Sequence, residues 1–374
     1  MPTKSPTAHR VLFHRHIHAK WSKIARVWTI VCCVGALLSG CSTAVLSQYR
    51  PSVPSGPVLV SKIHASWTLL HPRVSPPSAT GGVEAFDGRT NQLILYGGSP
   101  EYGTEMVDAT WLWTGRAWAS LHPTRHPDGV DGAVMAYDGD TRQLVLFGGE
   151  ADYGQNTYNT TWLWTGSTWT EAHPRVSPPV RNFPAMAFDP KSHQLLLFGG
   201  ENSTGDFNDT WTWTGSNWER LLPHQSPPRS SQQAAAYDPT VGGVVLFGGL
   251  VSTSTGLYPI GTWLWTGTDW VQLSPSSAPS PRSSVSVAWD PAAKVLVAFG
   301  GQSAASQPLS DTWVFERGEW RLLKVAPHPS ARAAGATFAY DPATRELVLF
   351  GGFKSSGLPD FGDTWILRLQ PLSR

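Results

Sequence analysis

Arginine recurs at equivalent places in this chain, and its chemistry suggests an anion-binding site. Each copy lies just ahead of a short segment that is rich in small residues and ends in an aromatic residue and Asp; the copies are Arg181, Arg229, Arg282 and Arg332. A guanidinium group binds a carboxylate or a phosphate through two parallel hydrogen bonds. We therefore predict that these arginines bind an acidic ligand. The alternative is that they bond to loop carbonyls or to acids of a neighbouring repeat.

A second candidate group combines carboxylates with aromatic rings. Its members lie in three successive segments that follow Gly-Gly pairs, and they are Glu101, Tyr102, Glu150, Tyr153, Glu201 and Phe207. Aromatic faces attract cations, and carboxylates accept hydrogen bonds from hydroxyl and amine groups. The combination favours a carbohydrate or a cation as the ligand, unless the acids are only solvated loop residues and the rings only pack at the rim.

The residue inventory argues against several kinds of catalytic site. All three cysteines (Cys32, Cys33 and Cys41) lie near the N-terminus, so the rest of the chain has neither disulfides nor a thiolate metal site. No serine triad, phosphate-binding loop or metal-ligand cluster is recognisable, and we predict no metal and no cofactor. Glu84 is the single carboxylate inside a small-residue segment. It is the one candidate for a catalytic base, although a structural ion pair explains it equally well.

The first 40 residues have the features of an export signal. They carry six basic residues and no acid, and an apolar run over Val27–Leu38 precedes Ser39-Gly40-Cys41. A basic region, an apolar stretch of about a dozen residues and a small-residue site describe a secretory signal. The Cys that directly follows Leu-Ser-Gly resembles a bacterial lipobox. This resemblance implies that residues 1–40 are a lipoprotein signal peptide and that Cys41 is lipidated.

An uncleaved transmembrane anchor over Val27–Leu46 is the alternative, because about 20 mostly apolar residues can span a bilayer. Either interpretation places the rest of the chain outside the cytoplasm, with residues 41–65 as a tether rich in Pro and Ser. Removal of residues 1–40 takes away six of the 28 basic residues and none of the 27 acidic ones. The resulting negative balance argues against a nucleic-acid partner, which usually requires a basic face.

Six internal repeats determine the predicted fold. Gly-Gly pairs recur every 49 to 52 residues, at 97–98, 148–149, 199–200, 248–249, 300–301 and 351–352. Each pair follows an apolar run such as "LVLFGG", and a Thr-Trp pair follows about ten residues later. We predict four strands per repeat, named a to d: the small-residue segment, the apolar run, the Thr-Trp segment and a second Trp-bearing segment.

This pattern resembles the kelch repeat of β-propeller proteins. The resemblance covers about residues 66–370 and depends on the apolar run with its Gly-Gly pair and on the Trp residues of strands c and d. It implies an all-β, six-bladed β-propeller over residues 66–374. The last repeat lacks strand d, whereas "SWTLLHP" (66–72) matches that strand and follows no other strand. We predict that this segment closes the ring by completing the sixth blade.

A propeller fold does not determine function. We predict a membrane-tethered binding module with a glycan, peptide or protein ligand on the face that carries the b–c and d–a loops, because such loops bind ligands more often than tight hairpins do. The resemblance also implies that the recurring arginines contact acidic ligands, as in some kelch proteins. The alternatives are a sugar or sugar-acid isomerase with its site at the channel mouth and a structural envelope protein. A copper site like that of galactose oxidase is excluded, because it requires a Cys within the ring.

Overall fold

The structure, a computed structural model, describes residues 63–100, 106–151, 156–253, 256–354 and 360–371. These residues form strands, turns and loops, and none of them belongs to a helix that could cross a membrane. The principal strands form six small antiparallel sheets, and each sheet corresponds to one repeat. The protein is therefore a six-bladed β-propeller, as the repeat pattern predicts.

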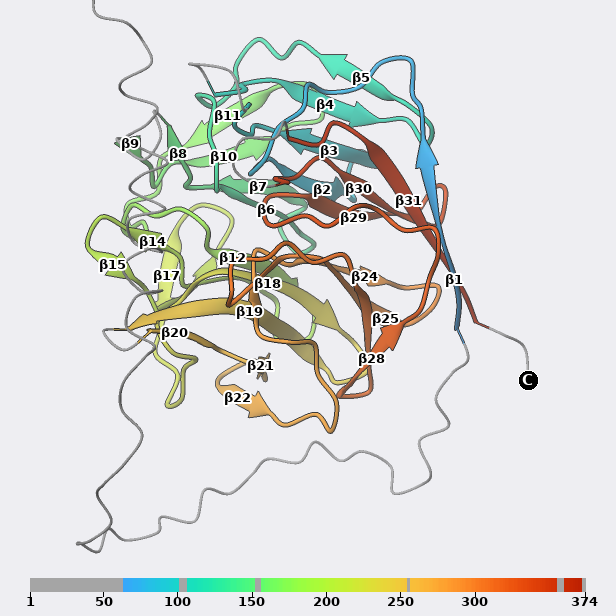
Figure 1. Cartoon of the computed structure of the whole chain (residues 1–374). Helices are drawn as coiled ribbons and strands as arrows, with labels where there is room; N and C mark the ends of the chain where they lie inside the picture. The colour runs from blue at the N-terminus through green and yellow to red at the C-terminus, as the bar shows by residue number, and fades with distance from the viewer. Residues whose placement is uncertain (1–62, 101–105, 152–155, 254–255, 355–359, 372–374) are drawn as a thin grey trace, which may run out of the picture. The chain divides into compact units, whose positions relative to one another are not determined.

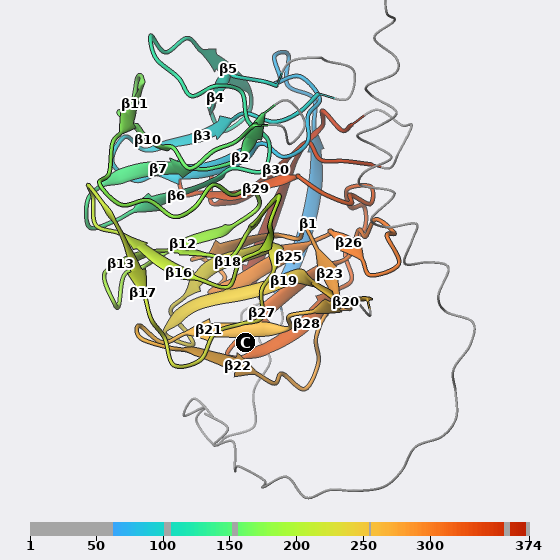
Figure 2. The same ribbon diagram turned by 90° about the vertical axis from the view of Figure 1, so that its left-hand side faces the viewer.

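Each blade orders its strands a-b-c-d, and the a strands of neighbouring blades contact one another all round the ring. Blade 1 contains β2 (Val83–Asp87), β3 (Gln92–Tyr96), β4 (Thr110–Trp113) and β5 (Trp118–Leu121). Blade 2 contains β6 (Val134–Asp138), β7 (Gln143–Phe147), β10 (Thr161–Trp164) and β11 (Trp169–Ala172). Blade 3 contains β12 (Ala185–Asp189), β13 (Gln194–Phe198), β16 (Thr210–Trp213) and β17 (Trp218–Leu221). Blade 4 contains β18 (Ser231–Asp238), β19 (Gly243–Thr253), β21 (Thr262–Trp265) and β22 (Trp270–Leu273). Blade 5 contains β24 (Ser286–Asp290), β25 (Val295–Phe299), β27 (Thr312–Glu316) and β28 (Glu319–Leu323). Blade 6 contains β29 (Thr337–Asp341), β30 (Glu346–Phe350), β31 (Thr364–Pro371) and β1 (Ile63–Leu70). Figure 2 shows β5, β11, β17 and β22 along the margin and β2, β18 and β29 towards the middle.

Strand β1 closes the ring by supplying strand d of the sixth blade. It pairs antiparallel with β31 over its whole length, from Ile63 opposite Pro371 to Leu70 opposite Thr364 (Figure 1). The predicted closing strand is confirmed, with shifted bounds. It begins earlier than residue 66 because β31 continues to Pro371 and offers partners there. It ends before residue 72 because Pro72 has no N–H for the ladder.

A belt of tryptophan side chains joins every blade to the one before it. The first Trp of strand d donates its indole N–H over 2.9–3.1 Å to the Thr that begins strand c of the preceding blade: Trp67 to Thr312, Trp118 to Thr364, Trp169 to Thr110, Trp218 to Thr161, Trp270 to Thr210 and Trp320 to Thr262. These bonds are buried, where an indole N–H needs such a partner. The closing strand must therefore carry a Trp in this register, and Trp67 meets that requirement.

The Gly-Gly pairs allow each blade to approach the next one closely. Gly148 and Gly149 have φ values of 71° and 94°, and the N–H of Gly149 donates to the carbonyl of Arg181 in the next blade over 3.0 Å. A Cβ on Gly148 would lie 2.7 Å from that same carbonyl oxygen. Both the backbone conformation and the space therefore require glycine.

Candidate functional site

The ring has a loop face, defined by the b–c loops and the segments that lead into strand a, and a hairpin face, defined by the tight a–b and c–d turns. On the loop face, short ladders continue beyond the Gly-Gly pairs and include β8 (Glu150–Ala151) with β9 (Asn156–Thr157) and β14 (Glu201–Asn202) with β15 (Gly205–Asp206). Figure 1 shows these four strands together on the left-hand side. In each blade a residue ahead of strand a pairs with the residue after the Gly-Gly pair: Thr80 with Ser99, Asp131 with Glu150, Asn182 with Glu201, Ser231 with Leu250, Ser283 with Gln302 and Ala334 with Phe353.

Backbone hydrogen bonds between blades fix the channel mouth on the loop face. Each donor and acceptor is the residue directly after one of the paired residues ahead of strand a. The bonds measure 2.6–3.2 Å and run from Gly132 to Gly81, Phe183 to Gly132, Gln232 to Phe183, Ser284 to Gln232 and Gly81 to Gly335. All six residues have φ between 52° and 71°. A mouth held by its own backbone can present side chains in fixed positions without a loss of loop entropy when a ligand binds.

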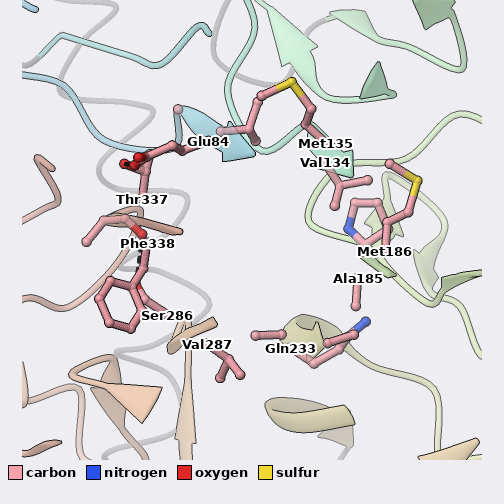
Figure 3. A pocket seen from close by; sticks show the side chains of 16 residues that line it. Glu84, Val134, Met135, Ala185, Met186, Gln233, Ser286, Val287, Thr337 and Phe338 are labelled. Carbon is pink, nitrogen blue, oxygen red and sulfur yellow. Dashed lines mark hydrogen bonds between the residues drawn. The ribbon is translucent and has the colours of Figure 1, made fainter. Parts of the chain in front are cut away.

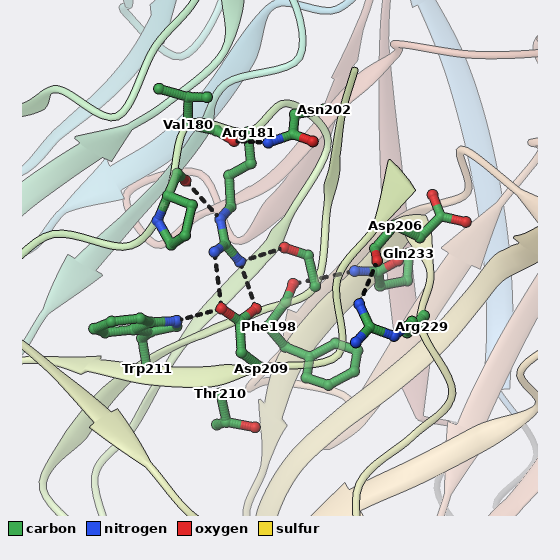
Figure 4. Close-up of polar contacts among 12 residues, drawn as sticks. Val180, Arg181, Phe198, Asn202, Asp206, Asp209, Thr210, Trp211, Arg229 and Gln233 are labelled. Atoms are coloured by element: carbon green, nitrogen blue, oxygen red, sulfur yellow. Dashed lines mark hydrogen bonds and ion pairs between the residues drawn. The ribbon is translucent and has the colours of Figure 1, made fainter. Parts of the chain in front are cut away.

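Three of the four predicted arginines are used inside the ring. Arg181 is fully buried and forms two parallel hydrogen bonds with Asp209, of 2.7 and 2.9 Å, and a third with the carbonyl of Gly199 (Figure 4). The same arrangement joins Arg282 to Asp311 and Arg332 to Asp363. The structure thus gives these arginines their alternative, structural role, and their hydrogen-bonding edges are not turned to a ligand.

Each of these pairs also holds an indole, and we call the three groups Arg–Asp locks. The acid of each lock accepts the N–H of the Trp two residues later over 2.7 Å: Asp209 from Trp211, Asp311 from Trp313 and Asp363 from Trp365. Burial alone would raise the pKa of Asp209, but the hydrogen bonds and charge of Arg181, with the Trp211 indole, lower it below its usual value. Asp311 shows the same balance of burial against Arg282 and Trp313, and its pKa is also lowered.

The fourth arginine and one predicted aromatic residue have different surroundings from those expected. Arg229 is exposed and donates to the carbonyl of Asp206 over 3.1 Å, because Ser230 occupies the buried place that Arg181 has in blade 3. Phe207 lies against the guanidinium of Arg181, 4.2 Å from ring centroid to Cζ. Phe207 therefore belongs to a lock, and Arg229 is the one recurring arginine on the surface.

A pattern in the repeats distinguishes the locked blades. Wherever Arg occupies the buried place, Asp precedes the Thr-Trp pair of strand c. In blades 1, 2 and 4 the two places hold Ala79 and Ala109, Val130 and Thr160, and Ser230 and Gly261. The two residues occur together or not at all, which could have revealed the locks from the sequence and excluded Arg229 from them.

Carboxylates over blade 2 form the polar part of the channel mouth. Glu150 accepts a hydrogen bond from Asn182, a side chain with 6% exposure, and Asn182 Oδ1 makes no hydrogen bond with any described residue. Burial and then the charge of Asp131 raise the pKa of Glu150 to about 7, although Asn182 opposes the shift. Burial raises the pKa of Asp131 to about 7 as well, with a smaller contribution from Asp360 and a backbone hydrogen bond from Gly132 acting against it.

The ring channel contains a cavity of about 210 Å³ below this mouth. Figure 3 shows Met135, Met186, Val287 and Phe338 around its open centre and Glu84 at its wall. Thr337 donates to one oxygen of Glu84, and the other oxygen is buried without a hydrogen bond to a described residue. Burial raises the pKa of Glu84 to about 8 against the Thr337 hydrogen bond, and the charge of Asp341 adds to the increase.

Several predicted site residues lie outside the described part of the chain, namely Cys41, Glu101, Tyr102 and Tyr153. Of the described ones, Glu150 and Glu201 lie in neighbouring blades on the loop face, and each pairs through its backbone with a residue ahead of strand a. Sequence reasoning did not identify Asp131 and Asn182. Their position, directly before a residue with positive φ, has no distinct pattern in the six repeats.

Comparisons with known proteins do not extend this description. A scan of the chain against protein-family models matches none of them, and a search of the curated proteins finds no match.

Proposed function

We propose that this protein is a kelch-type propeller that is exported as a lipoprotein and binds a ligand on its loop face. The observation that carries the proposal is the acidic mouth: Glu150 and Asp131 lie side by side on a backbone-bonded rim, next to Asn182, whose buried side-chain oxygen has no hydrogen bond to a described residue. Unsatisfied buried polar atoms in a folded protein need an explanation. A ligand with several donors would satisfy this site.

The composition of the mouth favours a polyhydroxylated or positively charged ligand. Asp131, Glu150 and the amide oxygen of Asn182 are acceptors when the acids are ionised, and a sugar hydroxyl or an amine supplies the matching donors. An anionic ligand would meet like charge here, because the three buried arginines are already neutralised by their own acids. We therefore favour a glycan or a basic peptide. Glu201, Glu101, Tyr102 and Tyr153 remain the candidates for further contacts.

The export part of the proposal depends on the leader alone. The Leu-Ser-Gly-Cys sequence at 38–41 supports lipidation of Cys41 and attachment to the outer surface of a cell membrane. Labelling with palmitate and the mass of the mature N-terminus test it. A Cys41→Ala variant should remain an unprocessed and unlabelled precursor. An unlabelled wild-type chain that keeps residues 1–40 would contradict lipidation.

The residues of the ring channel give little support to the alternative that the protein is an isomerase. An isomerase site needs an arginine and a carboxylate that converge, whereas the described residues that line the cavity include Glu84 but no arginine. The hydrogen-bond partner of Glu84 is Thr337, and its raised pKa keeps it mostly protonated at neutral pH. A protonated carboxyl group in the wall of a channel is a poor general base.

A binding screen with matched variants tests the ligand proposal. The full-length protein is applied to an array of neutral, basic and acidic glycans and of basic and acidic peptides. Hits should concentrate among neutral or basic ligands and weaken by about tenfold or more in Glu150→Gln, because charge-assisted hydrogen bonds are the strong ones. Asp140→Asn, an exposed acid on the hairpin face, is the control and should bind like wild type. Hits restricted to acidic ligands, or hits that Glu150→Gln leaves unchanged, would contradict the proposal.

A further inference from the structure

The exposed side chains of the hairpin face are mainly basic, in contrast to the acidic mouth. Its a–b turns carry exposed basic side chains in five of the six blades: Arg89, Arg142, Lys191, His193, Lys294 and Arg345. Among the described a–b turns the one exposed acid is Asp140, which pairs with His193 over 2.9 Å. The c–d turns add exposed Arg116 and Arg317, together with partly exposed Asp269, Glu316 and Glu319. Among the exposed side chains of this face, basic residues therefore outnumber acidic ones, whereas the Asp that ends each a strand is buried in its turn.

The repeat geometry places these basic side chains at one level around the ring. Arg142, His193, Lys294 and Arg345 occupy the same place, the residue before strand b, and all have φ between 55° and 59°. Equivalent positions in a closed ring lie in one plane perpendicular to its axis. Lys191 also reaches the turn of the next blade, where it donates to the carbonyl of Gly242 over 3.2 Å. The basic side chains therefore form a flat, incomplete circle, which has no member in blade 4, rather than a pocket.

A ring of aromatic side chains accompanies this circle. The residue before the last Asp of each a strand is aromatic and only partly buried: Phe86, Tyr137, Phe188, Tyr237, Trp289 and Tyr340. The ring edges of Tyr137 and Phe188 lie beside the first turn residue of the preceding blade, Gly88 and Gly139. Partly exposed aromatic residues with Lys and Arg around them are typical of surfaces at the membrane–water interface.

The chain also enters the ring on this face. Strand β31 runs from Thr364, opposite the end of β30 on the loop face, towards the hairpin face, and β1 runs back beside it. Ile63, the first residue of β1, pairs with Pro371 at the end of β31 and therefore lies at the hairpin face. Residues 41–62, which would connect a lipidated Cys41 to the ring, join it at the basic face.

We infer that the hairpin face docks on the anionic headgroups of the membrane that holds the lipid anchor, so that the loop face points away from the bilayer. A flat circle of cations with aromatic residues matches a plane of phosphates better than it matches a small ligand or a compact protein. The acidic mouth would be repelled from the same surface, which makes the orientation one-sided. This inference depends on the lipid tether of the proposed function. The exposed basic side chains of the hairpin face are observed independently of that tether.

The absence of cysteine from the ring permits a direct test. Two exposed alanines of blade 5 serve as reporter sites on opposite faces, Ala292→Cys on an a–b turn and Ala304→Cys on a b–c loop. Each full-length variant is reconstituted in vesicles of phosphatidylcholine alone or mixed with phosphatidylglycerol, and its reaction with a bulky maleimide is timed. Cys at 292 should react about tenfold more slowly with phosphatidylglycerol present, because several basic residues act together near the surface. Cys at 304 should react equally in both, and salt should remove the difference.

Two charge variants complete the test. Arg142→Gln, Lys294→Gln and Arg345→Gln together should abolish the protection at 292. Arg73→Gln, Arg175→Gln and Lys324→Gln together remove the same charge from exposed positions in the d–a connections and should preserve it. Equal rates at both reporters in every vesicle, or protection at 304, would overturn the inference. Flotation with phosphatidylcholine vesicles reports the lipid anchor separately, so a chain that fails to float contradicts the tether and not the basic face.

Discussion

Blades 2 and 3 have the same strands and the same Trp–Thr belt, but their loop-face ends are packed differently. Blade 3 is filled by the Arg181–Asp209 lock with Trp211 and Phe207. At the equivalent places of blade 2 are Val130 and Thr160, and a cavity of about 120 Å³ lies between them, Tyr158 and Trp162. The comparison shows that the lock is not needed to form a blade. In blade 3 the lock fills a space that blade 2 leaves open.

The locks are complete or absent because half a lock would be costly. A buried ion pair balances a large desolvation penalty with good geometry, and loss of one partner leaves a buried charge uncompensated. Each lock provides that geometry with two parallel bonds, a backbone carbonyl and an indole. Loss of either residue of a lock therefore costs more than the absence of both.

The largest effect is expected in blade 6, where a lock holds a blade whose outer strand comes from the other end of the chain. Deletion of residues 63–70 removes β1 and the buried Trp67 and exposes β31. Each large apolar side chain contributes about 1.5–3 kcal/mol on burial, and a domain has about 5–15 kcal/mol in total. We expect no cooperative thermal unfolding transition. Leu69→Ser, at an outward position with 37% exposure, should unfold like wild type. A deletion variant that melts within a few degrees of wild type would contradict closure by β1.

The next effect compares one residue in a locked blade with its equivalent in an open one. Asp209→Ala leaves Arg181 buried and unpaired, and we expect a loss of about 3–5 kcal/mol in the free energy of unfolding. Thr160→Ala in blade 2 should cost about 1 kcal/mol or less. Chemical denaturation of the two variants measures both. Equal losses in the free energy of unfolding would contradict a stabilising role of the ion pair in blade 3.

A transplanted lock should produce a smaller, coupled effect. Val130→Arg and Thr160→Asp each introduce one buried charge into the cavity of blade 2 and should destabilise the protein. The double variant should regain about 1–3 kcal/mol relative to the sum of the single variants, as coupled neighbours do. A second double variant, Val130→Gln with Thr160→Asn, changes the same two positions to uncharged residues. It is the control and should show weaker coupling. Strict additivity of the charged pair would show that the lock depends on features beyond these two residues.

The smallest effect is the pH dependence, which separates the lock acids from the mouth acids. Glu84, Asp131 and Glu150 have raised pKa values of about 8, 7 and 7 in the folded state. They take up protons more readily when folded, so stability should increase as the pH falls from about 8 to 5. Asp209 and Asp311 have lowered pKa values, so their contribution is present above the usual pKa of Asp and is lost as the pH falls below it.

The melting temperature should therefore rise by a few degrees between pH 8 and pH 5 and then fall in stronger acid. A scan of melting temperature against pH measures this. Glu150→Gln with Asp131→Asn should reduce the rise between pH 8 and pH 5 to the part that Glu84 contributes, and should leave the fall in stronger acid unchanged. A curve that is flat between pH 8 and pH 5 in the wild type would contradict the raised pKa values.

The sequence by itself determined the propeller, the number of blades and the strand that closes the ring. These features depend on local patterns, namely apolar runs before Gly-Gly pairs and Trp at fixed places, and each pattern is repeated six times. Repetition makes such patterns recognisable in the sequence, because every blade makes the same packing contacts with its neighbour. The closing segment could be identified for the same reason, since the belt requires a Trp such as Trp67 in every strand d.

The tertiary structure alone decided which polar side chains are available to a ligand. The Asp that accompanies each lock arginine is visible in the repeats, but only the structure shows that the two side chains bond to each other and that Ser230 takes the buried place in blade 4 and leaves Arg229 on the surface. The raised pKa values of Asp131, Glu150 and Glu84 arise from burial and from charges that are distant in the chain. Charge and burial at one point of a ring are sums over several blades, and no single repeat contains the residues that determine them.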